Sequence, residues 1–135
     1  MSRLYSSRLV ALTTGLNEKW LDNLLSHFAV PGVSIGRQGV RRDINDDGLL
    51  AIEVIRVLIQ TFGASLENAV DLSRRVISFR SQLEARVSAG LDLTLVLNLD
   101  SIEHRLHEQM VHAVESMAQV RRGRPSAISR SRLEH

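Results

Sequence analysis

Hydrophobic residues recur at two spacings along the chain, one typical of helices and one typical of strands. After the acidic start Asp46-Asp47, the residues up to Phe62 are mostly aliphatic, and Glu53, Arg56 and Gln60 form one narrow polar stripe among them. This pattern predicts a helix at the centre of the core. Asn45 is a favourable N-cap for that helix, and Gly63 ends it.

Two shorter helices are expected before this central one. Ser6 or Ser7 provides the N-cap of the first, and Gly15 ends it. Asn17 caps the second helix. The apolar face of the second helix consists of Leu16, Trp20, Leu21, Leu24 and Leu25.

The segment after Pro31-Gly32 changes to a short alternating pattern. Val33 and Ile35 alternate with polar residues, and Arg37-Gln38-Gly39 supplies a turn before Val40. We therefore predict a short β-hairpin between the second helix and the central helix.

The chain beyond Gly63 is expected to form a helix, then a strand. Ser65 caps a helix that should run to about Ala89. Leucines then alternate strictly, which predicts a strand over residues 91–99 with one buried face, and a helical continuation is the alternative. The sequence offers this strand no obvious local partner, so pairing across a dimer or against the hairpin is expected.

The last predicted element is a helix over residues 100–121, with Asp100 or Ser101 as its cap. Its apolar residues repeat at spacings of four and three, which is typical of a seam between two helices. We expect this seam to form a homodimer. Its residues are Ile102, Leu106, Met110, Ala113, Met117 and Val120.

Composition narrows the class of protein. The chain has 135 residues, enough for one domain, and no cysteine, which excludes a disulfide framework and a thiol nucleophile. Its first residues lack the apolar region of a secretory signal, and charges interrupt its longest apolar run. A cytoplasmic protein with no membrane span is therefore expected.

Charge is distributed unevenly along the chain. Residues 1–44 carry six basic and three acidic side chains, residues 45–120 six basic and eleven acidic, and residues 121–135 five basic and one acidic. Two basic ends around an acidic middle are typical of a protein whose ends contact a polyanion. We therefore expect the protein to associate with the nucleoid through its basic ends.

The order of elements, a helix pair, a hairpin and a helix with an acidic start, is that of a winged helix. Residues Tyr5–Val76 resemble the MerR-type winged-helix family, through YSSRLVALTTGLNEKWLDNL, GRQGVRRDINDDGLLAIEVIRVL and TFGASLENAVDLSRRV. The resemblance implies a mainly α fold with a winged helix-turn-helix over residues 1–80 and a dimerisation segment over residues 81–120. It also implies double-stranded DNA as partner and regulation of transcription by a homodimer.

The resemblance places DNA contacts on the helix pair and on the hairpin. Side chains that can contact bases or phosphates there are Ser7, Arg8, Asn17, Lys19, Asn23, Arg37, Gln38, Arg41 and Arg42. Asp22 departs from the family, which usually has arginine and aromatic residues in this helix, and it is expected to repel phosphates. The hairpin arginines are therefore the stronger candidates, with an ordinary solvated hairpin as the alternative.

The segment Arg121-Arg122-Gly123-Arg124-Pro125 resembles an AT-hook. An extended Gly-Arg segment fits the narrow, strongly negative minor groove over A·T pairs, and the flanking arginines can point into it. We place this basic tail at residues 121–132, with a free solvated tail as the alternative. The final residues 133–135 resemble a cloning scar.

Catalytic patterns are absent from the sequence. It contains no glycine-rich phosphate loop and no nucleophile motif, so neither an enzyme nor a cofactor is expected, and no small-molecule effector is evident. Three histidines and a glutamate share one helix, but without the spacing of a helical zinc site, so no metal is expected: His104, His107, Glu108 and His112. Two other functions stay open, a phage DNA-packaging or nucleoid-organising subunit and a protein-interaction adaptor such as an antitoxin.

Overall fold

The computed structural model describes residues 3–34 and 42–130, of which residues 120–130 are described by their backbone. The helices are α1 (Ser7–Thr14), α2 (Glu18–His27), α3 (Asp46–Phe62), α4 (Leu66–Ile77) and α5 (Leu99–Arg130). A two-stranded antiparallel sheet lies between α4 and α5 in the chain and consists of β1 (Glu84–Ser88) and β2 (Thr94–Asn98). The expected mainly helical class is confirmed.

The first four helices begin at the caps that the sequence predicts. Ser6, Asn17, Asn45 and Ser65 each accept a hydrogen bond from a backbone N–H in the first turn of the following helix. These bonds satisfy donors that a helix start would otherwise leave unpaired. The residue at which each of these helices begins is therefore set by a local capping hydrogen bond.

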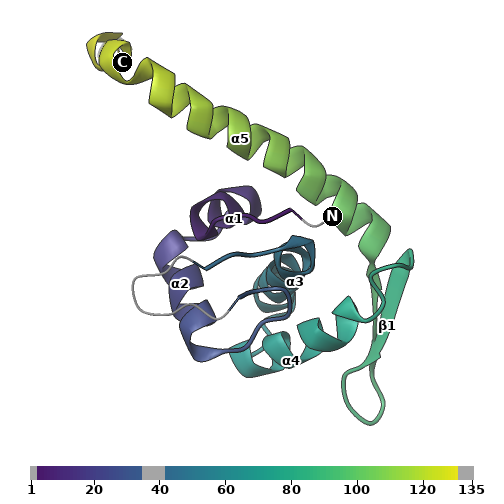
Figure 1. Cartoon of the computed structure of the whole chain (residues 1–135). Coiled ribbons are helices and arrows are strands. Elements are labelled where there is room, and N and C mark those ends of the chain that lie inside the picture. Colours follow the sequence, from purple (N-terminus) through teal and green to yellow (C-terminus); the bar gives the residue numbers. More distant parts are fainter. Residues whose placement is uncertain (1–2, 35–41, 131–135) are drawn as a thin grey trace.

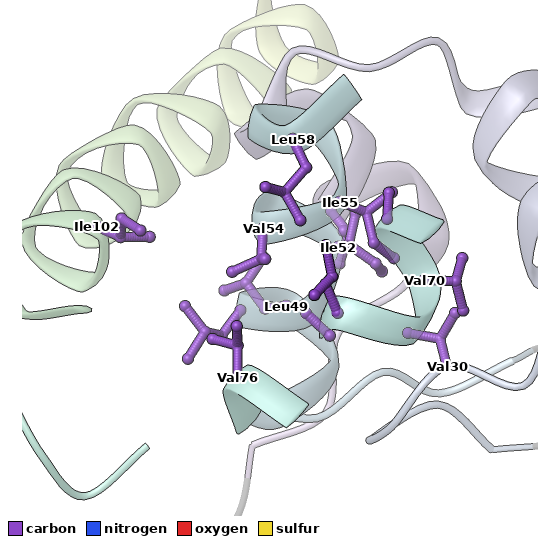
Figure 2. Packing of buried hydrophobic residues seen from close by; sticks show 14 of the residues in the cluster. Val30, Leu49, Ile52, Val54, Ile55, Leu58, Val70, Val76 and Ile102 are labelled. Atoms are coloured by element: carbon purple, nitrogen blue, oxygen red, sulfur yellow. The ribbon is translucent and has the colours of Figure 1, made fainter. Parts of the chain in front are cut away.

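Helix α3 is the centre of the hydrophobic core. Its side chains are buried from Gly48 to Ile55, and Figure 2 shows Ile52, Val54 and Ile55 packed among residues of the neighbouring elements. The core cluster also includes residues of α1, α2, α4, both strands and the start of α5. One continuous core therefore joins the segments 1–80 and 81–120.

Backbone bridges join the segment before α1 and the segment after α2 to the residues just before α3. Tyr5 and Val33 each form an antiparallel bridge with Ile44. Gly32 has a φ of 80° and packs so closely that an added Cβ would lie 2.2 Å from the backbone nitrogen of Gly48. A side chain at position 32 would therefore displace the start of α3.

The predicted helix from Ser65 to Ala89 is wrong in its second half. Helix α4 ends at Ile77, and residues 84–88 form β1, whose side chains alternate between exposed and buried. The alternation is visible in the sequence because Ala85 and Val87 stand between polar residues. Burial of these two small apolar side chains against the core favours the strand.

The predicted strand over residues 91–99 is confirmed in part, as β2 over residues 94–98. Its partner is β1, with Ala85 opposite Leu97 and Val87 opposite Leu95, so the strand has the local partner that the sequence analysis did not find, and that partner is not the segment after Pro31-Gly32. Leu91 and Leu93 lie in the turn between the strands and are exposed rather than buried.

Helix α5 starts earlier and ends later than predicted. The side chain of Asn98 accepts a hydrogen bond from the N–H of Ser101 and acts as the cap, in place of Asp100 or Ser101. The helix passes over α1, and its C-terminal half extends beyond the rest of the molecule in Figure 1. It continues through Arg121–Arg124 to Arg130, so the predicted end at residue 121 is wrong.

The apolar seam of α5 packs within the chain. Ile102, Leu106 and Ala113 are buried, and the Met110 sulfur lies 3.5 Å from the hydroxyl of Thr13 on α1. These four residues of the predicted dimer seam therefore pack against elements of their own chain. The structure places Met117, the last seam residue of the five expected contacts, half-buried on the same helix.

The polar stripe of α3 is not solvated as a whole. The Glu53 side chain is fully buried, whereas Arg56 is partly exposed and donates a hydrogen bond to Gln60 at 2.9 Å.

Among the described residues, no helix combines the length and the hydropathy that crossing a membrane requires.

Candidate nucleic-acid interface

A tight turn joins α1 to α2. Gly15 adopts a left-handed conformation with φ of 78°, and its N–H donates to the carbonyl of Ala11 at 2.9 Å. The N–H of Leu16 donates to the same carbonyl at 3.0 Å. This termination allows Asn17 to start α2 two residues later.

Helix α2 buries its inner face in the core and exposes its outer face. Leu21, Leu24 and Leu25 are buried in the core. Lys19 and Asn23 are exposed, as the sequence predicts for a surface that contacts DNA. An exposed helix with a rigid apolar back is able to present these two side chains to a groove.

Asn17 has a structural role that limits its use as a reader of bases. Its Oδ1 atom accepts hydrogen bonds from the N–H groups of Lys19 at 2.9 Å and Trp20 at 3.1 Å. A bidentate contact to adenine needs both the oxygen and the nitrogen of an asparagine amide. Capping therefore occupies the oxygen of Asn17, whereas Asn23 is an exposed amide on this face.

Arg42 lies beside α2, at one end of the predicted hairpin. Its Nη2 atom donates to the Ser26 hydroxyl at 2.7 Å, and its Nη1 atom lies 3.8 Å from the Asp22 carboxylate. Asp22, expected to repel phosphates, thus has a cation next to it. Ser26 was not among the predicted site residues, although it follows Asp22 by four positions and so shares its helix face.

The C-terminal end of α2 is held by Arg74 of α4. The guanidinium donates twice to the carbonyl of Ala29, at 2.9 and 3.2 Å. Arg74 is also absent from the site residues that the sequence predicts, because a contact over 45 residues leaves no local pattern. These bonds hold the loop that follows α2 against α4.

The two ends of the predicted hairpin are described, while residues 35–41 between them lie outside the described residues. The N–H of Ser34 donates to the carbonyl of Asp43 at 2.9 Å, and the N–H of Asp43 donates to the Ser34 hydroxyl at 2.9 Å. The predicted site residues Arg37, Gln38 and Arg41 fall in the part of the chain that is not described.

The remaining predicted contacts of the helix pair differ in exposure. Arg8 is exposed on α1, whereas Ser7 is half-buried in the first turn of the same helix.

Tyr5, just before α1, donates a hydrogen bond to Asp46 at 2.7 Å. Burial raises the pKa of the Tyr5 phenol above its usual value, and the bond to Asp46 raises it further.

The basic tail has a helical backbone where an extended one was expected. Arg121, Arg122, Gly123 and Arg124 all belong to α5. Glycine and proline both weaken a helix, by about 1 and about 3 kcal/mol relative to alanine. Gly123 and Pro125 therefore make this part of α5 the easiest to unwind.

The described residues show no arrangement that would bind a metal ion. No group of three or more histidine, cysteine, aspartate or glutamate side chains there is arranged to hold a metal ion. His104, His107, Glu108 and His112 are exposed on α5.

Comparison of the chain with protein-family models, with curated proteins and with solved structures finds no match.

Proposed function

We propose that α1, α2 and the first hairpin form a winged helix-turn-helix and that the protein binds double-stranded DNA. The observation that carries this proposal is the position of Arg42, which Ser26 and Asp22 hold beside the exposed face of α2. Helix and hairpin base thus offer one continuous polar surface with Lys19 and Asn23. Such a surface suits a helix in the major groove and a hairpin against the backbone.

The charges of this surface suggest that phosphate contacts and base readout come from different parts of the protein. Helix α2 carries Glu18 and Asp22 as well as Lys19, so its own attraction for DNA is weak. The arginines of the hairpin and of residues 121–124 supply the phosphate contacts, which dominate affinity. Asn23 then supplies base readout in the groove.

In this proposal the protein is a homodimer that regulates transcription by occupying two half-sites. A two-fold axis duplicates α2 and brings its copies to successive turns of the duplex. Because Ile102 and Leu106 are buried in the core of the single chain and Met110 contacts Thr13 of α1, we place the dimer contact on a surface other than the predicted seam.

The test is binding to labelled duplex DNA, followed by fluorescence anisotropy over a range of salt concentrations. Lys19→Ala and Arg42→Ala are each expected to weaken binding and to lower the salt slope by about 0.9 if one phosphate contact is lost. Asn23→Ala is expected to reduce discrimination between sequences by about 1–3 kcal/mol.

The matched control is Arg86→Ala, which removes an exposed arginine from β1, away from α2. It is expected to leave both affinity and slope unchanged. If the wild-type chain does not bind DNA at low salt, the proposal is wrong and a protein-interaction adaptor becomes the better explanation. Protection of a long stretch of DNA, instead of one palindromic site, would indicate a packaging or nucleoid-organising subunit.

A further inference from the structure

The sheet formed by β1 and β2 has an open edge along β2. The N–H of Ala89 donates to the carbonyl of Leu93, and the register places Val87 opposite Leu95. In an antiparallel ladder the hydrogen-bonded pairs alternate, so the backbone groups of Thr94 and Val96 point away from β1. Within the described part of the chain, these groups meet no hydrogen-bond partner.

The two edges of the sheet differ in their protection. On the β1 edge, Arg75 of α4 donates to the carbonyl of Ser88 at 2.6 Å, and the strand carries Glu84 and Arg86. Strand β2 reads Thr-Leu-Val-Leu-Asn and carries no charge. Natural sheets usually protect a free edge with charged side chains, proline or a covering element, and β2 has none of these within its five residues.

Exposed apolar side chains surround the same edge. Val96 is 52% exposed at the middle of β2, and Leu93 is exposed just before the strand. Leu93 and Leu95 line a cavity of about 360 Å³ together with Phe62, which is also exposed. An uncharged edge next to exposed apolar side chains indicates a surface that another strand covers.

We propose that this edge pairs with β2 of a second copy of the chain, antiparallel and centred on Val96. The two-fold axis then places Val96 opposite Val96 of the second copy and Thr94 opposite Asn98 of the second copy. The outward backbone groups of Thr94 and Val96 gain partners in this register. The combined sheet has four strands in the order β1, β2, β2 of the second copy, β1 of the second copy.

Both faces of the combined sheet are compatible with this register. On the inner face, Val87 and Leu95 of one copy continue into Leu97 and Ala85 of the second copy, which is an unbroken apolar row. On the outer face, two valines separate Arg86 from Arg86 of the second copy. Pairing β1 with β1 about Arg86 would instead place two arginines directly opposite each other, which is unfavourable.

This inference deepens the proposed function, because it names the contact of the homodimer. It rests on that proposal only for the use of the dimer on DNA. The contact itself is tested in the absence of DNA, so failure of DNA binding and failure of the β2 contact are separate results.

The experiment measures molar mass by sedimentation equilibrium for the full chain and for Val96→Lys. The wild type is expected to be a dimer, and the variant is expected to dissociate at least about tenfold more readily, since two lysines would face each other across the axis. Leu12→Lys is the matched control, because Leu12 is an apolar side chain of α1 with a similar exposure of 46%. It should remain dimeric.

A second pair of variants tests the register itself. Val96→Lys and Val96→Glu should each be monomeric, and an equimolar mixture should restore the dimer, because position 96 faces position 96. This rescue also shows that both variants fold. A monomeric wild type, or an intact Val96→Lys dimer, would overturn the proposal. Dissociation by Val114→Lys with no effect of Val96→Lys would assign the contact to α5 instead.

Discussion

Glu53 of α3 and Arg105 of α5 form an ion pair around a carboxylate that is fully buried. Arg56 completes the arrangement with two hydrogen bonds, from Nε to Oε1 at 2.9 Å and from Nη2 to Oε2 at 2.7 Å. Hydrogen bonding to Glu53 raises the pKa of the Arg56 guanidinium above its usual value, against the opposing effect of burial. A buried carboxylate is tolerated here because two arginines neutralise it.

Replacement of Glu53 by glutamine should destabilise the fold. The variant Glu53→Gln keeps the shape but leaves Arg56 and Arg105 against a neutral amide, so we expect a loss of about 1–3 kcal/mol in the free energy of unfolding. Urea denaturation measures it. Glu84→Gln is the control, because the Glu84–Arg86 pair is exposed and should contribute less than about 1 kcal/mol. Equal effects of both variants would contradict the stabilising role of Glu53.

Truncation of the α5 seam should affect folding of the single chain. Leu106 is 4% exposed in the core, so Leu106→Ala is expected to lower the free energy of unfolding by about 2–5 kcal/mol. Chemical denaturation at several protein concentrations gives the value and separates it from dissociation. Val114→Ala, on the exposed side of the same helix, should cost much less. A loss that vanishes at high protein concentration would show that Leu106 contacts a second copy.

Removal of the Asp22 charge should strengthen DNA binding. Asp22 lies 3.8 Å from Arg42 and on the same face of α2 as the proposed DNA contacts. Asp22→Asn removes an exposed anion, so we expect an affinity about two- to fivefold higher, together with a steeper salt slope. Anisotropy titrations measure both. Weaker binding would contradict this expectation and would assign Asp22 a positioning role through Arg42.

Deletion of residues 121–132 should weaken DNA binding and flatten its salt dependence. Each lost phosphate contact removes about 0.9 from the slope. A helical backbone does not fit the AT-hook geometry, so Pro125→Ala, which strengthens this part of α5, should also weaken binding to A·T-rich duplexes. Circular dichroism checks the gain in helix. An unchanged slope after the deletion would exclude the tail from the interface.

Tyr5 provides a prediction at alkaline pH. It is the single tyrosine of the chain, so the ultraviolet absorbance of phenolate reports it alone. Its pKa is raised from 10.0 in the folded state, so its contribution to stability is fully present below pH 10.0 and is lost as the pH rises through the folded pKa. Asp46→Asn should move the absorbance midpoint back towards 10.0. A wild-type midpoint at or below 10.0 would contradict the buried, hydrogen-bonded phenol.

Local signals in the sequence predict the helices of the first half of the chain and their ends. Ser6, Asn17, Asn45 and Ser65 act within three residues of their own position, and Gly15 and Gly63 end helices through their own backbone conformation. Such interactions need no information about the rest of the fold. The exposed positions of Lys19 and Asn23 also follow, because the helical period fixes which side of α2 is apolar.

The partners of each surface were decided by the tertiary structure. The sequence determined that Ile102, Leu106 and Met110 lie on one apolar face, yet a period cannot tell whether that face meets α1 of the same chain or a second copy. The sequence showed the alternation of apolar and polar residues in β2, whereas the residues of β1 lie in a segment whose pattern also suits a helix. The charge of Glu53 is tolerable only because Arg105, 52 residues away, folds back onto it. Periodicity and capping are short-range, whereas the choice of partner depends on how the whole chain buries its apolar surface.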